Sequence, residues 1–226
     1  MNDMGKGVPV QMLNPATRLF IVEFKAGRTD LFFTPDPTVA LQVGDLVIVE
    51  ADRGQDLGKV KEDKITVDDV RAFNVARKQE MDVNVNGAVS ARIKGALTNI
   101  LVGEANAEAG GGLNPNPAVK AVQRELMPKR IFGKAGPADR QLLTAKLQDE
   151  AQALALCQQR VKQKRLPMEV LDAEYQWDRR KLTFYFIAEK RIDFRELVRE
   201  LFRIHKTRIW MASLDHSYLQ DDDNKS

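Results

Sequence analysis

Residues 171–187, LDAEYQWDRRKLTFYFI, predict a β-hairpin. Apolar and polar side chains alternate through the first part of this stretch, which is the period of a strand with one buried face. The polar turn DRRK follows, and Leu182, Phe184 and Phe186 then share one face of the returning strand. The two strands are therefore expected to lie side by side, with their apolar faces on the same side of a sheet.

Strand and helix patterns continue on both sides of this hairpin. A short strand is expected over residues 129–132, and a long helix over residues 137–165. A second helix should begin where Asp193 and Glu196 have the spacing of a capping box, and a final strand should cover residues 207–211. This order of elements predicts a ferredoxin-like βαββαβ sandwich, with both helices on one face of an antiparallel sheet, and hence an α+β protein.

The N-terminal part of the chain has a different pattern. Short runs of β-branched and aromatic residues, bounded by glycine, proline and aspartate, characterise residues 18–67, and a helix is expected from Asp68 to Met81. Gly54 and Gly58 are interpreted as positions that need a positive φ angle or close packing. A small β-rich domain that also contains a helix is therefore predicted.

Asparagine, glycine, alanine and proline dominate residues 82–118, so this range is predicted to be a linker or insertion. Apolar residues at partly helical spacing within residues 88–102 could form a short helix that docks on this chain or on another one, and the alternative is nascent, mobile structure. The expected organisation is an N-terminal tail (1–17), a β-rich domain with a helix (18–81), the linker or insertion (82–118), a ferredoxin-like domain (119–213) and an acidic tail (214–226).

The composition is that of a globular protein, with 43% apolar and 30% charged residues. The 35 basic and 32 acidic side chains nearly cancel, so the net charge of +3 does not by itself indicate a nucleic-acid partner. Cys157 is the only cysteine, which excludes an internal disulfide and a cysteine-rich metal site, and it is expected to lie in the core. The sequence has neither a secretion signal nor an apolar run long enough to span a membrane, and a cytoplasmic location is expected.

The common catalytic and phosphate-binding motifs are absent from the sequence, and no cofactor or metal is expected. His205 and His216 are the only histidines, and their spacing fits structural or surface residues better than a metal site. One enzymatic alternative stays open, because Asp45, Asp52 and Asp56 could supply oxygen ligands for a divalent ion in a hydrolase.

A basic face on the last predicted helix is the main candidate for binding. Arg195, Arg199 and Arg203 recur every four residues, and Lys206 and Arg208 follow. A guanidinium group can donate two parallel hydrogen bonds to two phosphate oxygens. Single-stranded RNA is therefore a reasonable ligand for this face. The structural alternative is an ordinary salt-bridged surface, in which Glu196 and Glu200 on the same helix pair with these arginines.

The tip of the predicted hairpin is a second candidate. Arg179, Arg180 and Lys181 bring positive charge there, and Trp177 precedes them with a ring that could stack on a base. A tryptophan at such a position is more often part of the core.

Two blocks of sequence resemble a known family. Residues 44–60, GDLVIVEADRGQDLGKV, and residues 191–202, RIDFRELVRELF, are similar to the PSP-one C-terminal domain family, which includes the bacterial YaaT (RicT) proteins and kinetoplastid cycling-sequence RNA-binding proteins. The resemblance covers roughly residues 18–67 and 129–211. The cysteine cluster of the bacterial members is missing, so an iron–sulfur role is not expected.

The resemblance implies regulation rather than catalysis, because bacterial members look like specificity adaptors for messenger-RNA cleavage and eukaryotic members associate with messenger-RNA control. The favoured hypothesis is a non-catalytic adaptor that assembles with protein partners in an RNA-regulatory complex. Direct binding of single-stranded RNA through the basic face is the first alternative, and a metal-dependent hydrolase is the second. The sequence leaves the oligomeric state open.

Overall fold

The computed structural model describes residues 5–79, 90–108 and 125–214. These residues form two compact units, which meet along the chain at Pro137 and Ala138. We call them the N-terminal unit and the C-terminal unit. The predictions for residues 82–89, 109–118 and 215–226, and for residues 1–4 of the predicted N-terminal tail, concern parts of the chain outside the described residues.

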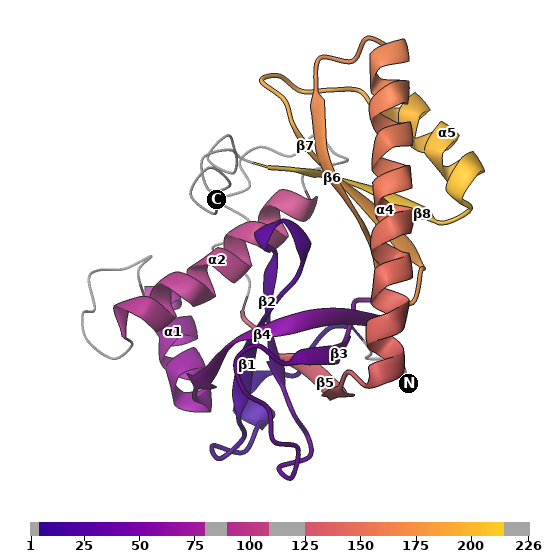
Figure 1. Ribbon diagram of the computed structural model, residues 1–226. Helices are drawn as coiled ribbons and strands as arrows, with labels where there is room; N and C mark the ends of the chain where they lie inside the picture. The colour runs from indigo at the N-terminus through magenta and orange to yellow at the C-terminus, as the bar shows by residue number, and fades with distance from the viewer. Residues whose placement is uncertain (1–4, 80–89, 109–124, 215–226) are drawn as a thin grey trace. The chain divides into compact units, whose positions relative to one another are not determined.

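A closed barrel forms the centre of the N-terminal unit (Figure 1). Within the described residues its strand order is β1-β2-β5-β3-β4, with β1 also paired to β4. Side chains from all five strands fill the interior, among them Phe20, Phe32, Val49, Val60 and Ile131. The strands are β1 (Leu19–Glu23), β2 (Thr29–Phe33), β3 (Leu46–Glu50), β4 (Gln55–Ile65) and β5 (Lys129–Lys134).

Helices α1 (Val67–Gln79) and α2 (Ala91–Glu108) pack with the other face of β1, β2 and β4. The predicted helix near Asp68 is confirmed, and Thr66 and Asp69 cap it by exchanging hydrogen bonds with each other's backbone N–H. Two short 3-10 helices, η1 (Val10–Met12) and η2 (Lys25–Gly27), complete the unit.

Residues 82–118 were predicted to be a linker or an insertion, and the part of this range that forms α2 is a packed helix rather than a linker. Leu97, Ile100 and Leu101 are buried in the same cluster as Val70 and Phe73 of α1. These three residues lie on one face of the helix, and burial of such an apolar face is what stabilises most helices in proteins. This burial outweighs the tendency of the surrounding glycine and asparagine residues to disfavour a helix. The helix predicted within residues 88–102 therefore exists, and it docks on its own chain.

The C-terminal unit contains the long helix α4 (Pro137–Gln163), which begins at the predicted proline, and a sheet with the order β6-β7-β8. The predicted hairpin is confirmed as β6 (Glu169–Tyr175) and β7 (Lys181–Ile187), which run antiparallel. Helix α5 (Arg195–His205) then crosses to β8 (Arg208–Ser213), which lies parallel to β7. Both helices contribute to one core with the sheet, through Cys157 of α4, Phe184 of β7 and Leu201 of α5.

The α+β character of the chain is confirmed, but the ferredoxin-like arrangement is not. The strand predicted at residues 129–132 exists as β5, yet it pairs in parallel with β2 and antiparallel with β3 inside the barrel. The C-terminal sheet is left with β6, β7 and β8 among the described residues, and it is mixed rather than antiparallel. The C-terminal domain was predicted to start at residue 119, whereas the C-terminal unit includes the chain from Ala138 onward.

The two singled-out glycines have the two predicted roles. Gly54 has a φ of +84° in the turn between β3 and β4, where Ala51 N–H donates to the Gly54 carbonyl. At Gly58, a Cβ atom would lie 2.4 Å from Cγ1 of Val22 and 2.8 Å from the ring of Phe24. Close packing inside the barrel therefore requires the second glycine.

Candidate functional site

Helix α5 presents an apolar face to the sheet and a basic face outward. Leu197 and Leu201 are fully buried one turn apart and fix the helix on β7 and β8. The helix ends at Lys206, whose φ of +53° is left-handed and whose N–H donates to the Phe202 carbonyl. At the start of the helix Asp193 accepts the Arg195 N–H, but Glu196 bonds to Lys164 instead of completing the predicted capping box.

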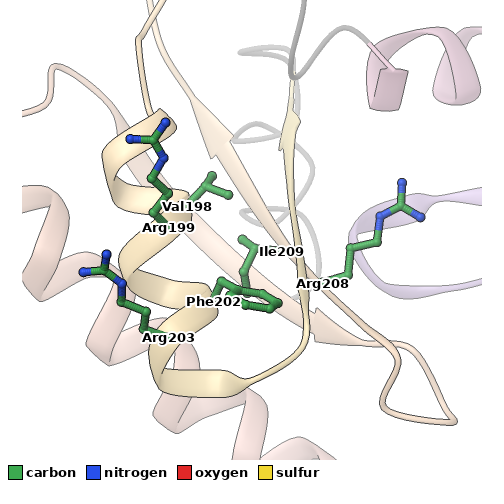
Figure 2. Close-up of a pocket in the computed structure, with 6 residues that line it drawn as sticks. All are labelled: Val198, Arg199, Phe202, Arg203, Arg208 and Ile209. Carbon is green, nitrogen blue, oxygen red and sulfur yellow. The ribbon is translucent and has the colours of Figure 1, made fainter.

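A pocket of about 490 Å³ opens between α5 and the edge strand β8. Figure 2 shows the apolar side chains of Val198, Phe202 and Ile209 turned toward each other across it. Arg199 and Arg203 extend from α5 away from β8, and Arg208 leaves on the other side of the strand (Figure 2). We call these six residues the α5–β8 groove.

The acidic side chains of α5 do not pair with the groove arginines. Glu200 binds Nε of Arg160 at 3.0 Å and Nζ of Lys164 at 3.1 Å, and Glu196 binds the same Lys164 at 2.8 Å. The hydrogen bond from Lys164 lowers the pKa of Glu196. A salt-bridged surface therefore exists, but its ion pairs join α5 to α4, and the expected ion pairs of Glu196 and Glu200 with Arg199 and Arg203 are not among those of the described residues.

Arg199 and Arg203 consequently make no ion pair with any residue that the structure describes. Arg195 differs from them, because Asp193 holds its guanidinium at 2.6 Å. These bonds lower the pKa of Asp193 to about 2. The predicted stripe is thus divided into one paired arginine and two that are available to a partner.

The other predicted residues of this face flank the groove. Lys206 is exposed at the end of α5 and does not line the pocket. The Arg208 guanidinium lies 5.3 Å from the centre of the Trp210 ring, as in a cation–π contact. Lys181 is the neighbour of Arg208 across the β7–β8 pair.

The residues at the tip of the β6–β7 hairpin belong to the C-terminal unit but do not line the α5–β8 groove. Arg179 binds Asp149 at 2.8 Å and its guanidinium lies 4.9 Å from the centre of the Tyr175 ring. Arg180 pairs with Asp178 on the turn itself. Trp177 lines a smaller pocket of about 230 Å³, together with Arg179 and two residues of α4, Leu142 and Lys146. Most of the tip charge is therefore neutralised within the chain.

Sequence reasoning missed the apolar part of the groove. Phe202 is 52% exposed although it is a large aromatic residue on a helix whose core positions are leucines. Val198 and Phe202 are four residues apart, on a different face from Leu197 and Leu201, and this offset was visible in the sequence.

Cys157 and His205 are both explained by packing. Cys157 is completely buried, and burial raises the pKa of its thiol to about 12, so the prediction of a core cysteine is confirmed. The Nδ1 atom of His205 lies 3.1 Å from the Tyr175 hydroxyl, and its buried Nε2 atom has no hydrogen-bond partner in the described structure. His216 lies outside the described residues.

His205 should make the protein less stable in mild acid. Burial lowers the pKa of His205 below its ordinary value of 6.5. As the pH falls through about 6.5, the unfolded chain gains a proton that the folded chain does not, so the free energy of unfolding decreases until the pH reaches the lower pKa of the folded state. Urea unfolding at several pH values, in a His216→Gln background with and without His205→Gln, measures this decrease. Titration of the His205 ring at or above its ordinary pKa, followed by NMR, would contradict it.

Each carboxylate proposed for a metal-dependent hydrolase forms an ion pair with a different cation. The pairs are Asp45 with Lys134, Asp52 with Lys129, and Asp56 with Arg28. Burial alone would lower the pKa of Lys129, but Asp30 and Asp52 outweigh it and raise that pKa. In the described part of the chain, no three histidine, cysteine, aspartate or glutamate side chains are grouped as a metal site would need.

Residues 129–214 match the model of the PSP1 C-terminal conserved region. This segment of the chain is therefore similar to the PSP1 C-terminal conserved region. The resemblance expected from the sequence blocks is thereby confirmed, and the α5–β8 groove lies entirely within the matched PSP1 region.

Three curated relatives support this assignment. An uncharacterized protein of Schizosaccharomyces pombe is 45% identical over 197 residues, covering 87% of this chain and 23% of the relative. Protein PSP1 of Saccharomyces cerevisiae is 29% identical over 234 residues, covering 90% and 28%. Stage 0 sporulation protein YaaT of Bacillus subtilis is 38% identical over 86 residues, covering 38% and 31%. The chain thus spans about a quarter to a third of the length of these relatives.

No solved structure matches the chain. Among the helices of the described residues, none combines the length and apolar character needed to cross a membrane.

Proposed function

We propose that this chain, which contains a PSP1 C-terminal conserved region, is a non-catalytic regulatory adaptor in messenger-RNA metabolism, and that it binds a protein partner through the α5–β8 groove. The observation that carries the proposal is the combination of an exposed aromatic residue, Phe202, with two arginines, Arg199 and Arg203, that have no ion pair in the described structure. The messenger-RNA setting rests on the resemblance to the family alone.

The composition of the groove is that of a protein-binding surface. Interfaces are enriched in aromatic residues and arginine, and a few such residues in a pocket usually carry most of the binding energy. Phe202 lies between Val198 and Ile209, so a partner side chain placed there would remove apolar surface from water on three sides. The flanking arginines favour a partner with negative charge next to its apolar groups.

Direct binding of single-stranded RNA is the second candidate, and one observation favours it. Arg199 and Arg203 are available to phosphates, and Arg208 with Lys181 continues the positive charge toward Trp210. Phosphate binding would, however, leave the apolar centre of the groove unused. The role of Phe202 therefore separates the two candidates.

Site-specific crosslinking tests the adaptor. A photoreactive phenylalanine analogue in place of Phe202 should form crosslinks to protein in cells, and these should survive RNase treatment. The matched control is the same analogue at Phe132 on the barrel strand β5, where the side chain is 49% exposed, nearly the same as Phe202. Equal crosslinking from both positions, or adducts that consist only of RNA, would refute the proposal.

The double charge reversal Arg199→Glu, Arg203→Glu should weaken binding of the crosslinked partner by about tenfold, because two attractions become repulsions at the edge of the site. The midpoint of thermal unfolding should change little, since neither side chain has an ion pair to lose within the described chain. The matched control is Arg195→Glu, on the same helix but outside the groove.

Binding assays at several salt concentrations complete this test. If RNA is the ligand, the double variant should flatten the salt dependence of RNA binding, while Phe202→Ser should leave RNA affinity nearly unchanged. If a protein is the ligand, Phe202→Ser should abolish binding. Retained partner affinity in both variants would rule out the groove.

A further inference from the structure

The two edge strands of the C-terminal sheet differ in the hydrogen bonds that their outer backbone groups receive from the rest of the unit. At the β6 edge, side chains of α4 satisfy backbone groups, since Glu150 accepts the Tyr175 N–H at 2.7 Å and Gln158 donates to the Val170 carbonyl at 2.8 Å. At the β8 edge, no hydrogen bond to the outer side of the strand comes from any residue the structure describes. An edge with unpaired backbone groups is a template for another strand.

The direction of the backbone groups along β8 follows from one hydrogen bond. Leu214 N–H donates to the Phe186 carbonyl of β7 at 2.8 Å. Because alternate residues of a strand in a parallel pair bond to the same neighbour, Ala212 and Trp210 also face β7. Ile209, Met211 and Ser213 therefore direct their N–H and C=O groups to the free edge.

We propose that an extended, acidic segment of a partner protein binds the α5–β8 groove by adding to β8 as a fourth strand. This inference rests on the proposed function and specifies the mode of binding and the chemistry of the partner. Main-chain hydrogen bonds to β8 provide the attachment, as in other cases of strand addition. Every second side chain of the segment faces the pocket formed by Val198, Phe202 and Ile209.

The positive charge around the pocket favours an acidic partner segment. Arg199, Arg203 and Arg208 all border the pocket, and Lys206 follows directly after α5. The acidic residues of α5, Glu196 and Glu200, form their ion pairs with α4, and in the described structure neither of them forms an ion pair with these arginines. A second copy of this chain would bring the same arginines to the shared edge, so like charges oppose that occupant.

The probe for the test is a short synthetic peptide of alternating aspartate and leucine, titrated into the full chain. Two further versions carry N-methyl groups on one or the other alternate set of amides, which removes hydrogen-bond donors from one edge of the peptide only. One methylated set should weaken binding by about tenfold or more, because two or three main-chain hydrogen bonds are lost, whereas the other set should bind like the parent. Amide hydrogen exchange at Ile209, Met211 and Ser213 should slow when the parent peptide binds.

Several outcomes would overturn the proposal. Equal affinity of the two methylated peptides, or unchanged exchange at the three amides, would exclude strand addition while leaving a groove-bound protein partner intact. Equal binding of a lysine–leucine peptide would exclude the acidic chemistry. A concentration-dependent dimer that the peptide dissociates would make a second copy the occupant, and a marked gain in peptide affinity on deleting residues 215–226 would assign that role to Asp221, Asp222 and Asp223.

The experiment that would refute the proposed function is different from the experiments that would refute strand addition. If Arg199→Glu, Arg203→Glu and Phe202→Ser leave the crosslinked partner bound, then the groove is not the partner site, whatever the peptides show.

Discussion

Replacing Glu150 with leucine is expected to lower the free energy of unfolding of the C-terminal unit by about 3–5 kcal/mol. The Glu150 carboxylate is buried on α4, where it binds Nζ of Lys146 at 2.6 Å and accepts the Tyr175 N–H at 2.7 Å. The substitution leaves the buried Lys146 ammonium and the strand N–H without their acceptor. Urea unfolding of the full chain, followed by a probe in the C-terminal unit, measures the loss.

Two controls identify the cause of this loss. The double variant Lys146→Met, Glu150→Leu should recover most of the stability, because replacing a whole buried pair with apolar residues is often neutral. Asp149→Ala, which removes only the exposed pair with Arg179, should cost less than about 1 kcal/mol. A Glu150→Leu variant as stable as Asp149→Ala would show that the buried pair is not needed.

Replacing Phe184 with alanine is expected to cost about 3–5 kcal/mol, as for other large-to-small changes in a core. Phe184 is completely buried in the middle of β7, in the cluster that holds Leu197 and Leu201 of α5, and its ring centre lies 6.3 Å from that of His205. The cavity removes the support of α5, so the groove should also be lost. Circular dichroism during urea unfolding measures the stability, and peptide titration measures the groove.

Phe202→Ala provides the matched comparison, because it removes the same side chain from an exposed position on the other side of α5. Its stability should stay close to that of the parent, and its partner binding should be lost. Phe184→Leu, which keeps most of the volume, should fold with a cost below about 1.5 kcal/mol and retain the groove. Equal destabilisation by Phe184→Ala and Phe202→Ala would contradict the division between core and binding face.

The elements of the C-terminal unit were predictable because their patterns are local. Alternation from Leu171 onward and the helical spacing of Leu197 and Leu201 each depend on residues a few positions apart. The partners of β5 were not predictable in this way, because its pairs with β2 and β3 join residues more than about eighty positions apart, such as Phe32 with Lys129 and Val49 with Ile131. A short strand with one interior residue, Ile131, fits either sheet equally well by pattern alone.

The candidate site was predicted in part for a similar reason. Arg199 and Arg203 followed from helical spacing, and their exposure agrees with it. Their freedom from ion pairs depends on Lys164 and Arg160, which reach Glu196 and Glu200 from a different helix. The position of Ile209 beside Phe202 depends on the parallel return of β8, so the groove itself required the tertiary structure.

The position of β5 has a practical consequence for work on the PSP1 region. The matched segment begins at Lys129, so a fragment cut there would carry away the strand that joins β2 to β3. The remaining N-terminal piece would expose the edges of both strands, and the fragment itself would begin with an orphan strand bearing the half-exposed Phe132. Both pieces would tend to aggregate, whereas a cut after Lys134 leaves the barrel with all its strands.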